Sequence, residues 1–229
     1  LGQKLMAKDV FADVFKTLEM WEGSTAGGAQ PMYMGLASLK SSDYDISNVT
    51  YGHLSEKSNL HRRAYMKAYI NVKGVKIAVF SVHLGFNDKT VVKDSWNEII
   101  NLMKKEEYAI VMGDMNDNPR NRSVKHCLRS VSHPKRAADG ALFNPFYRVN
   151  GSYHYRERWY QYDQILLSAH LLGEGGLSLV KSRGAYGSIF RADYMVDGRG
   201  RPSPTYRATE YVGGVSDHLP AYVLLNKKM

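Results

Sequence analysis

The chain has 229 residues, of which 44% are hydrophobic and 23% are charged. These proportions are those of a soluble globular protein, and they exclude a disordered or fibrous chain. Lys and Arg number 31 against 22 Asp and Glu, so the net charge is +9. This excess favours anionic partners: nucleic acid, phosphorylated small molecules or acidic membrane surfaces. Cys127 is the only cysteine, which excludes an internal disulfide.

The beginning of the chain carries no targeting signal that we recognise. Its first residues lack the apolar core of a signal peptide. No stretch approaches the roughly 20 consecutive apolar residues of a membrane-spanning helix. Residue 1 is Leu and not Met, so we expect that the gene starts further upstream.

The first third of the chain predicts one helix and three strands. Residues 5–18 carry apolar side chains at spacings of mostly three and four, the period of a helix with one buried face. Residues 22–28 are rich in Gly, Ser and Thr, which predicts a loop, and residues 33–39 follow as a short strand. Small or aliphatic residues alternate with polar and tyrosine residues over 64–72, which predicts a half-buried strand. The mostly apolar residues 75–84 predict a strand buried on both faces.

The remainder interleaves helical and strand patterns. Ser95 and Glu98 resemble a capping box, and the apolar spacing after them predicts a helix that ends at the Lys104-Lys105 pair. We predict further strands at 108–112, 159–167 and 220–225, a short helix at 122–131, and a long surface excursion between 169 and 214. Adjacent strands also join through tight turns, which predicts an α/β layered fold with mixed sheets. No linker divides the sequence, so we expect a single domain over residues 1–229.

Four polar clusters lie on or beside the predicted buried strands. Ser81-Val82-His83-Leu84 and Gly113-Asp114-Met115-Asn116 end strands, Tyr162-Asp163-Gln164 places an acid inside one, and Ser216-Asp217-His218-Leu219-Pro220 introduces the last. Each has a purely structural alternative, such as a hydrogen-bonded core histidine, a loop cap or a solvated pair. A carboxylate inside a strand, as at Asp163, needs a partner if it is buried.

Taken together, the four clusters suit metal-assisted hydrolysis of a phosphoric ester. Carboxylates bind a hard divalent cation through oxygen, and such a cation neutralises charge on the phosphoryl oxygens. An Asp or His can activate water, while a cationic His stabilises the charged transition state. The sequence therefore predicts a phosphoesterase that uses Mg²⁺ or Mn²⁺.

These motifs resemble those of the endonuclease/exonuclease/phosphatase superfamily, which has the DNase I-like fold. They occur in family order over residues about 30 to 225, and Tyr33-Met34-Gly35-Leu36-Ala37 is similar to the family's Tyr-x-Gly-Val-Ala strand. The resemblance implies a two-sheet β-sandwich flanked by helices in four layers. The stretch from Asn144 through Asp163 to Gly213-Gly214 also resembles uncharacterised bacterial members, and we expect a soluble protein of the bacterial cytoplasm or an exported one.

The resemblance also implies roles for the histidines and their neighbours. His218 would contact the scissile phosphate and be oriented by Asp163, and His83 would be the second histidine on the phosphate side. Asp217 would be a metal ligand. A carboxylate beside His218 raises the pKa of that histidine, which suits binding of a dianionic transition state.

Three further roles follow from the same resemblance. Asp114 would orient or deprotonate the attacking water, Asn116 would bind a phosphoryl oxygen, and Tyr33 would hydrogen-bond the phosphate. A complete family member begins with a strand-helix-strand unit that carries an Asn and a metal-binding Glu, and neither is visible here. Glu19 and Glu22 match this Glu by residue type only, so we assign neither.

The sequence leaves the substrate open. The +9 charge and the Arg- and Tyr-rich run from Tyr153 to Tyr160 favour a nuclease, although a twisted strand pair with solvated arginines would look the same. The alternatives are a phospholipid or inositol-phosphate head-group hydrolase and a catalytically silent phosphate-binding module, the latter because of the missing Glu. The mode of cleavage, endo or exo, and the oligomeric state are not encoded in any motif.

Overall fold

The computed structural model describes residues 13–26, 30–55, 63–85, 89–137, 140–149, 151–172, 177–207 and 209–227. The strands are β1 (Phe15–Ala26), β2 (Gln30–Leu39), β3 (Ile46–Ser55), β4 (Arg63–Val72), β5 (Val75–His83), β6 (Ala109–Asp114), β7 (Ser130–Val131), β8 (Leu142–Phe143), β9 (Tyr153–Tyr155), β10 (Arg158–Tyr160), β11 (Asp163–Ser168), β12 (Leu177–Val180), β13 (Gly187–Ile189), β14 (Tyr206–Arg207), β15 (Glu210–Tyr211) and β16 (Ala221–Lys227). The helical segments are α2 (Lys89–Met103), a π-helical turn at Ser123–Cys127 and short 3₁₀ turns at Pro134–Arg136, His170–Leu172 and Asp193–Met195.

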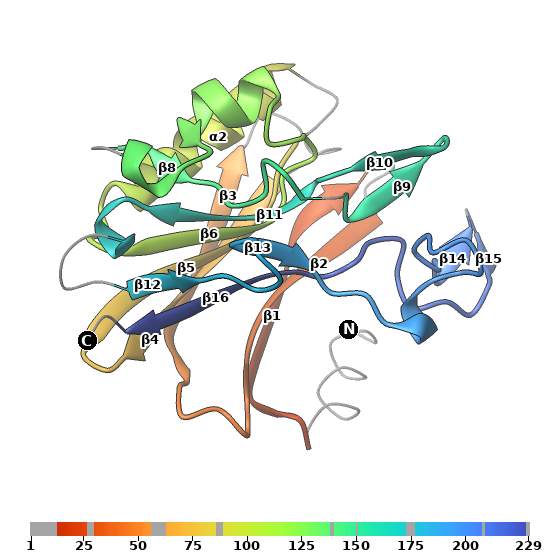
Figure 1. Cartoon of the computed structure of the whole chain (residues 1–229), viewed down its shortest axis with the longest axis horizontal. Helices are drawn as coiled ribbons and strands as arrows, with labels where there is room; N and C mark the ends of the chain where they lie inside the picture. Colours follow the sequence, from red (N-terminus) through yellow and green to blue (C-terminus); the bar gives the residue numbers. More distant parts are fainter. Residues whose placement is uncertain are drawn as a thin grey trace.

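A mixed sheet forms the centre of the molecule (Figure 1). In the part of the chain that the structure describes, it has seven strands in the order β3-β4-β5-β6-β11-β8-β7. β5 and β6 are parallel and α2 connects them, whereas β4 with β5 and β6 with β11 are antiparallel. Most residues of β5 are buried, as expected of a strand covered on both faces.

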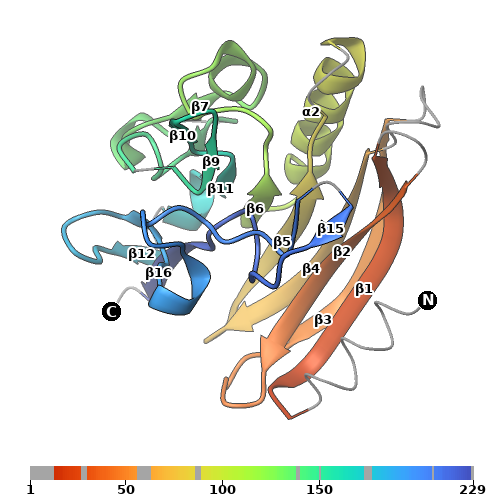
Figure 2. The same cartoon turned by 90° about the vertical axis from the view of Figure 1, so that its right-hand side faces the viewer.

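A second layer of strands covers one face of this sheet, and α2 covers the other. The apolar face of α2, with Trp96 and Ile99, packs on Phe80 and Val111 of the central strands. On the opposite face, residues of β2 and β12 pack against residues of β4 and β5. Figure 2 shows the long β1–β2 hairpin curving alongside β3 and β4. The predicted α/β sandwich of two sheets with flanking helix is thereby confirmed.

Two predictions near the beginning of the chain are wrong where the structure describes it. Phe15 to Leu18 belong to the extended strand β1 and not to a helix, and residues 22–26 continue this strand instead of forming a loop. The period-three spacing of the apolar residues was misleading because β1 is held by its pairing with β2 over its whole length. Residues 1–12, where most of the predicted helix falls, lie outside the described residues.

Three further boundaries differ from the prediction. Ser95 lies in the middle of α2 and is fully buried, so it is no N-cap: the helix begins six residues earlier, at Lys89. The predicted strand at 159–167 is two strands, β10 and β11, because the chain leaves the ladder at residues 161–162. The predicted helix at 122–131 is limited to the turn Ser123–Cys127, and Ser130 already pairs in a strand.

The register of the central sheet brings predicted site residues to one edge. His83 lies opposite Asp114 in the parallel β5–β6 pair, and Asp114 lies opposite Asp163 in the antiparallel β6–β11 pair. These three residues therefore occupy neighbouring positions at adjacent strand ends. Among the described residues, no helix is long and apolar enough to cross a membrane.

Candidate functional site

His218 and Asp163 form the best-defined contact of the site. The Nδ1–H of His218 donates to Oδ2 of Asp163 at 2.7 Å. The same carboxylate oxygen accepts the hydroxyl of Ser152 at 2.5 Å, and the backbone N–H of Asp163 donates to that hydroxyl at 3.2 Å. Ser152 is fully buried, so the Asp163 carboxylate has one orientation in which to hold the imidazole through its Nδ1 atom.

Tyr153 fixes the other side of the histidine ring. Its ring stacks on that of His218, with centroids 4.5 Å apart and planes at 27°. The backbone supports this arrangement, because Tyr153 and His218 form an isolated antiparallel bridge and Leu219 donates its N–H to the carbonyl of Ser152 at 2.8 Å. The turn that introduces β16 is thus attached to the β9–β10 hairpin. No sequence motif pointed to Ser152, and the Arg- and Tyr-rich run that contains Tyr153 did not predict its contact with His218, because both residues become neighbours of His218 only through long-range pairing.

The turn after β6 holds Asp114 and Asn116 in place. Gly113 has φ +141°, and a Cβ there would lie 1.9 Å from the carbonyl oxygen of Val82, so only glycine fits beside β5. Asn116, with φ +51°, donates its backbone N–H to Oδ1 of Asp114 at 2.7 Å and its side-chain amide to the carbonyl of Leu84 at 2.7 Å. The two strand ends are thereby joined through the side chain of Asn116.

Side-chain amides hold the residues after Asn116 through hydrogen bonds to β11 and to the segment before it. Gln164, fully buried, donates to the carbonyl of Asp117 at 2.6 Å and accepts from Asn144 at 2.6 Å. Asn118 accepts the backbone N–H of Gln161 at 2.8 Å. This network connects the turn after β6 to β11. The sequence placed Gln164 in a polar cluster but assigned no site role to it or to Asn144, because these contacts join segments far apart in the chain.

The surroundings of the two histidines shift their pKa values in opposite directions. Burial lowers the pKa of His218, but the hydrogen bond to Asp163 and the charges of the nearby carboxylates outweigh it, so the pKa is raised. Burial is also the largest influence on His83, and there the charge of Arg63 adds to it, which lowers the pKa to about 4. At neutral pH His83 is therefore neutral, and its 3.5 Å contact with Oδ2 of Asp114 is no ion pair.

Asp114 is a carboxyl group that ionises close to neutrality. Burial raises its pKa to about 6, the charge of Asp163 acts in the same direction, and the hydrogen bond from Asn116 opposes both. Arg63, the first residue of β4 and only 2% exposed, contributes a nearby positive charge. Arg63 was also missed by the sequence analysis. A carboxylate with this pKa accepts a proton more readily than an ordinary aspartate.

The other predicted site residues lie less centrally. Asp217 precedes His218 and is exposed, and its charge acts on His218 and Tyr153. Tyr33 lies in β2, where it pairs with Glu22 of β1, and its side chain is outside the described residues. Glu19 lies in β1 opposite β2, and not among the strand ends that carry Asp114.

The donor set of this site suits a metal ion whose remaining ligands come from substrate phosphate and water. The described residues contain no cluster of three or more His, Cys, Asp or Glu side chains arranged to hold a metal. Mg²⁺ is commonly bound through one or two carboxylates together with substrate phosphate and water. The exposed carboxylate of Asp217 can serve as one such ligand at the edge of the site.

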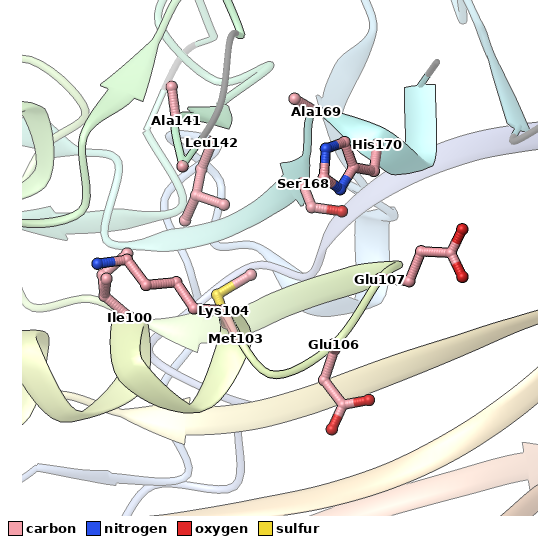
Figure 3. Close-up of a pocket in the computed structure, with 11 residues that line it drawn as sticks. Ile100, Met103, Lys104, Glu106, Glu107, Ala141, Leu142, Ser168, Ala169 and His170 are labelled. Carbon is pink, nitrogen blue, oxygen red and sulfur yellow. The ribbon is translucent and has the colours of Figure 1, made fainter. Parts of the chain in front are cut away.

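A pocket lies at the opposite end of the central sheet (Figure 3). It has a volume of about 160 Å³ and is lined by Met103, Lys104, Leu142 and His170 among others. Ala109, at the first position of β6, donates its N–H to Ser168 beside this pocket at 3.0 Å. None of the predicted site residues lines it, so it is separate from the strand ends that carry His83 and Asp114.

Comparisons with known proteins agree with this arrangement. The sequence profile of the endonuclease/exonuclease/phosphatase family matches residues 87–227. An endonuclease/exonuclease/phosphatase of Bacteroides vulgatus has a similar structure with TM-score 0.64 and 14% identity, over 99% of this chain and 81% of that one. The mannosyl-6-phosphatase of Bacteroides thetaiotaomicron gives 0.62 and 15%, over 97% and 82%. TDP2 of D. rerio, solved with a single-strand DNA product, gives 0.59 and 12%, over 99% and 82%. No curated protein matches in sequence.

Proposed function

Because the chain belongs to the endonuclease/exonuclease/phosphatase family, we propose that it is a divalent-metal-dependent phosphoesterase, acting as one catalytic domain over residues 1–229. The family is one of phosphoric ester hydrolases, which supports this class of reaction. The observation that carries the proposal is an acid and a base at the same strand ends: the His218 imidazole and the Asp114 carboxylate. His218, with a raised pKa, is held by Asp163, while Asp114 has a pKa of about 6.

In the proposed reaction, Asp114 accepts a proton from the attacking water. Its pKa of about 6 keeps it ionised at neutral pH yet basic enough to act. The bond from the water oxygen to phosphorus forms as the bond to the leaving oxygen breaks. His218, protonated and fixed through its Nδ1, donates from Nε2 to a phosphoryl oxygen and stabilises the charge that develops there.

Two other side chains would bind the phosphoryl group. His83 is neutral and adjoins Asp114, so its ring positions substrate without adding charge. The amide of Asn116 donates one hydrogen to Leu84 and has a second for a phosphoryl oxygen. Tyr33 is the third candidate for the phosphate. Asp217 would hold the Mg²⁺ or Mn²⁺ ion, which when bound neutralises phosphoryl charge.

A nuclease is the favoured form of this activity. The net charge of +9 and the cationic and aromatic residues between Tyr153 and Tyr160 support an anionic, base-bearing substrate. TDP2 of D. rerio was solved with a single-strand DNA product, which is compatible with this choice. A phospholipid or inositol-phosphate head group is the alternative, and the mannosyl-6-phosphatase of Bacteroides thetaiotaomicron illustrates a small phosphomonoester in a similar fold.

The decisive experiment compares substrates under Mg²⁺, Mn²⁺ and EDTA. We expect metal-dependent hydrolysis of single- or double-stranded oligonucleotides that exceeds hydrolysis of inositol phosphates and sphingomyelin. Asp114→Ala and His218→Ala should each abolish it. If the wild-type protein hydrolysed none of these substrates but still bound inorganic phosphate, it would instead be a catalytically silent phosphate-binding module.

A further inference from the structure

A basic groove runs along the side of the molecule beside β13. Two recesses of about 490 and about 300 Å³ share Arg148, Val149 and Ala185 in their walls, so they form one continuous depression. One wall is built from residues 132–136 and 143–149, and the other from residues 181–191 with Tyr222 of β16. We call this depression the basic groove.

Every Lys, Arg, Asp or Glu side chain that lines the basic groove is a Lys or an Arg. Five cationic side chains contribute to its walls: Arg136, Arg148, Lys181, Arg183 and Arg191. All five are exposed, and no Asp or Glu is part of the lining. Within the described residues, none of the five lies in an ion pair with a carboxylate. Cations that line one depression with no carboxylate among its lining residues repel one another, and an anionic ligand would relieve that repulsion.

One end of the basic groove adjoins the catalytic strand ends. Phe190 donates its N–H to the carbonyl of Pro220 at 2.8 Å, and Ile189 pairs with Ala221. His218 precedes Ala221 by three residues, about 10 Å of extended chain at most. Arg191 lies over the ring of Trp159 at 4.9 Å, on the β9–β10 hairpin that also carries the Tyr153 stacked on His218.

Aromatic rings accompany the cations. Tyr147, Tyr186 and Tyr222 line the groove, with Lys181 over the ring of Tyr186 at 5.3 Å. From Arg191 to Ala185 the wall spans six residues, about 20 Å of near-extended chain. Cations that follow a backbone, interleaved with rings on which bases stack, are the usual combination in sites for single-stranded nucleic acid. A membrane surface is flat and would not enter a recess of this shape.

We propose that the basic groove binds the sugar-phosphate backbone of a single-stranded nucleic acid whose scissile phosphate lies at His218. This proposal rests on the phosphoesterase function above, which it extends by naming the substrate class and the path of the strand. Arg191 and Trp159 meet the strand where it leaves the catalytic site. Arg148 and Arg183 bind phosphates further along, where the two recesses join.

Binding measured in EDTA tests the groove independently of hydrolysis. The probe is a fluorescein-labelled 12-nucleotide oligo(dT), followed by anisotropy at several salt concentrations. The double variant Arg148→Glu/Arg183→Glu should bind at least tenfold more weakly. The slope of log K against log salt should fall by about 1.4, since each lost phosphate contact on a single strand contributes about 0.7. The milder Arg148→Gln/Arg183→Gln should show the same trend if the first variant folds poorly.

The matched control is Lys76→Glu/Lys105→Glu, which changes the net charge equally at two exposed positions outside the groove. It should bind the oligonucleotide within twofold of the wild type. Equal losses in both variants would overturn the proposal, because they would reflect overall charge alone. So would unchanged oligonucleotide binding by the groove variant together with lost binding to phosphatidylserine vesicles.

A second basic recess provides the rival path. It is lined by Lys93, Arg120 and Arg122, but also by Asp117, whose carboxylate accepts from Ser123. If Arg120→Glu/Arg122→Glu abolished oligonucleotide binding while the groove variant retained it, the strand would follow that recess and the proposal would be wrong. If the groove variant loses binding but no hydrolysis is found in any metal, the groove assignment stands and the phosphoesterase function fails.

Discussion

The substitution Asp114→Asn should stabilise the folded protein at neutral pH while removing its activity. The carboxyl is 18% exposed and lies in a buried turn, and burial raises its pKa to about 6 from the ordinary 3.8. At 1.36 kcal/mol for each pH unit, this difference corresponds to about 3 kcal/mol of destabilisation by the ionised form. The substituted amide is neutral at every pH, and it keeps an oxygen that can accept the N–H of Asn116.

The sign of the effect depends on pH. A carboxyl whose folded pKa is raised costs nothing below pH 3.8, and its cost grows until the pH passes about 6. The free energy of unfolding of Asp114→Asn should therefore equal that of the wild type near pH 4 and exceed it by up to about 3 kcal/mol at pH 8. In the wild type, His83 contributes the opposite trend: its pKa is lowered to about 4, so its contribution to stability increases from pH 4 to 6.5.

The assay is urea unfolding of both proteins in EDTA at unit steps from pH 4 to pH 8. The exposed Asp43→Asn serves as the control variant. A difference between Asp114→Asn and wild type that did not change with pH would refute the assigned cause. Loss of stability in Asp114→Asn at pH 8 would refute it as well, because it would mean that the charge is solvated or paired in the folded state.

Three other substitutions test the supports of the site. Gly113→Ala should unfold the protein or cost more than about 3 kcal/mol in urea, because its Cβ would meet a backbone carbonyl at 1.9 Å; Gly74→Ala, where nothing lies within 4 Å, should cost about 1 kcal/mol. Ser152→Ala should lower kcat about tenfold with little change in KM and shift the alkaline limb of the pH profile, since Asp163 loses its 2.5 Å hydrogen bond. An unchanged pH profile would contradict the role of Ser152 in orienting Asp163. Gln164→Leu should cost about 3 kcal/mol in thermal unfolding, because several buried partners lose their bonds, and a loss below about 1 kcal/mol would disagree.

The central sheet was predictable because its strands carry strong local patterns. β4 alternates with a period of two, and its buried residues include Ala64, Met66 and Ala68, as that pattern requires. β5 and β6 are nearly continuous apolar runs bounded by a turn and by polar motifs. His83 and Asp114 end β5 and β6, so their neighbouring positions follow from these two patterns and the parallel pairing. Asp163 begins β11, and it lies opposite Asp114 only because β11 pairs antiparallel with β6.

The rest of the site depends on contacts that no local pattern encodes. Ser152 reaches Asp163 because the bridge from Tyr153 to His218 positions it, and Arg63 lies at the site because β4 begins there. The beginning of the chain was misread for a related reason: Phe15 to Leu18 have helical spacing, yet pairing with β2 extends them. Tertiary pairing prevails over local periodicity where the two conflict.

Hydrolysis of bis(p-nitrophenyl) phosphate tests the central claim most directly, because this small diester needs only the catalytic strand ends. The rate with Mn²⁺ should rise through pH 6 as Asp114 ionises, be lost in EDTA, and fall at least a hundredfold in His218→Gln. Equal rates in wild type and His218→Gln, or hydrolysis that persists in EDTA, would contradict a metal-dependent phosphoesterase built on these residues.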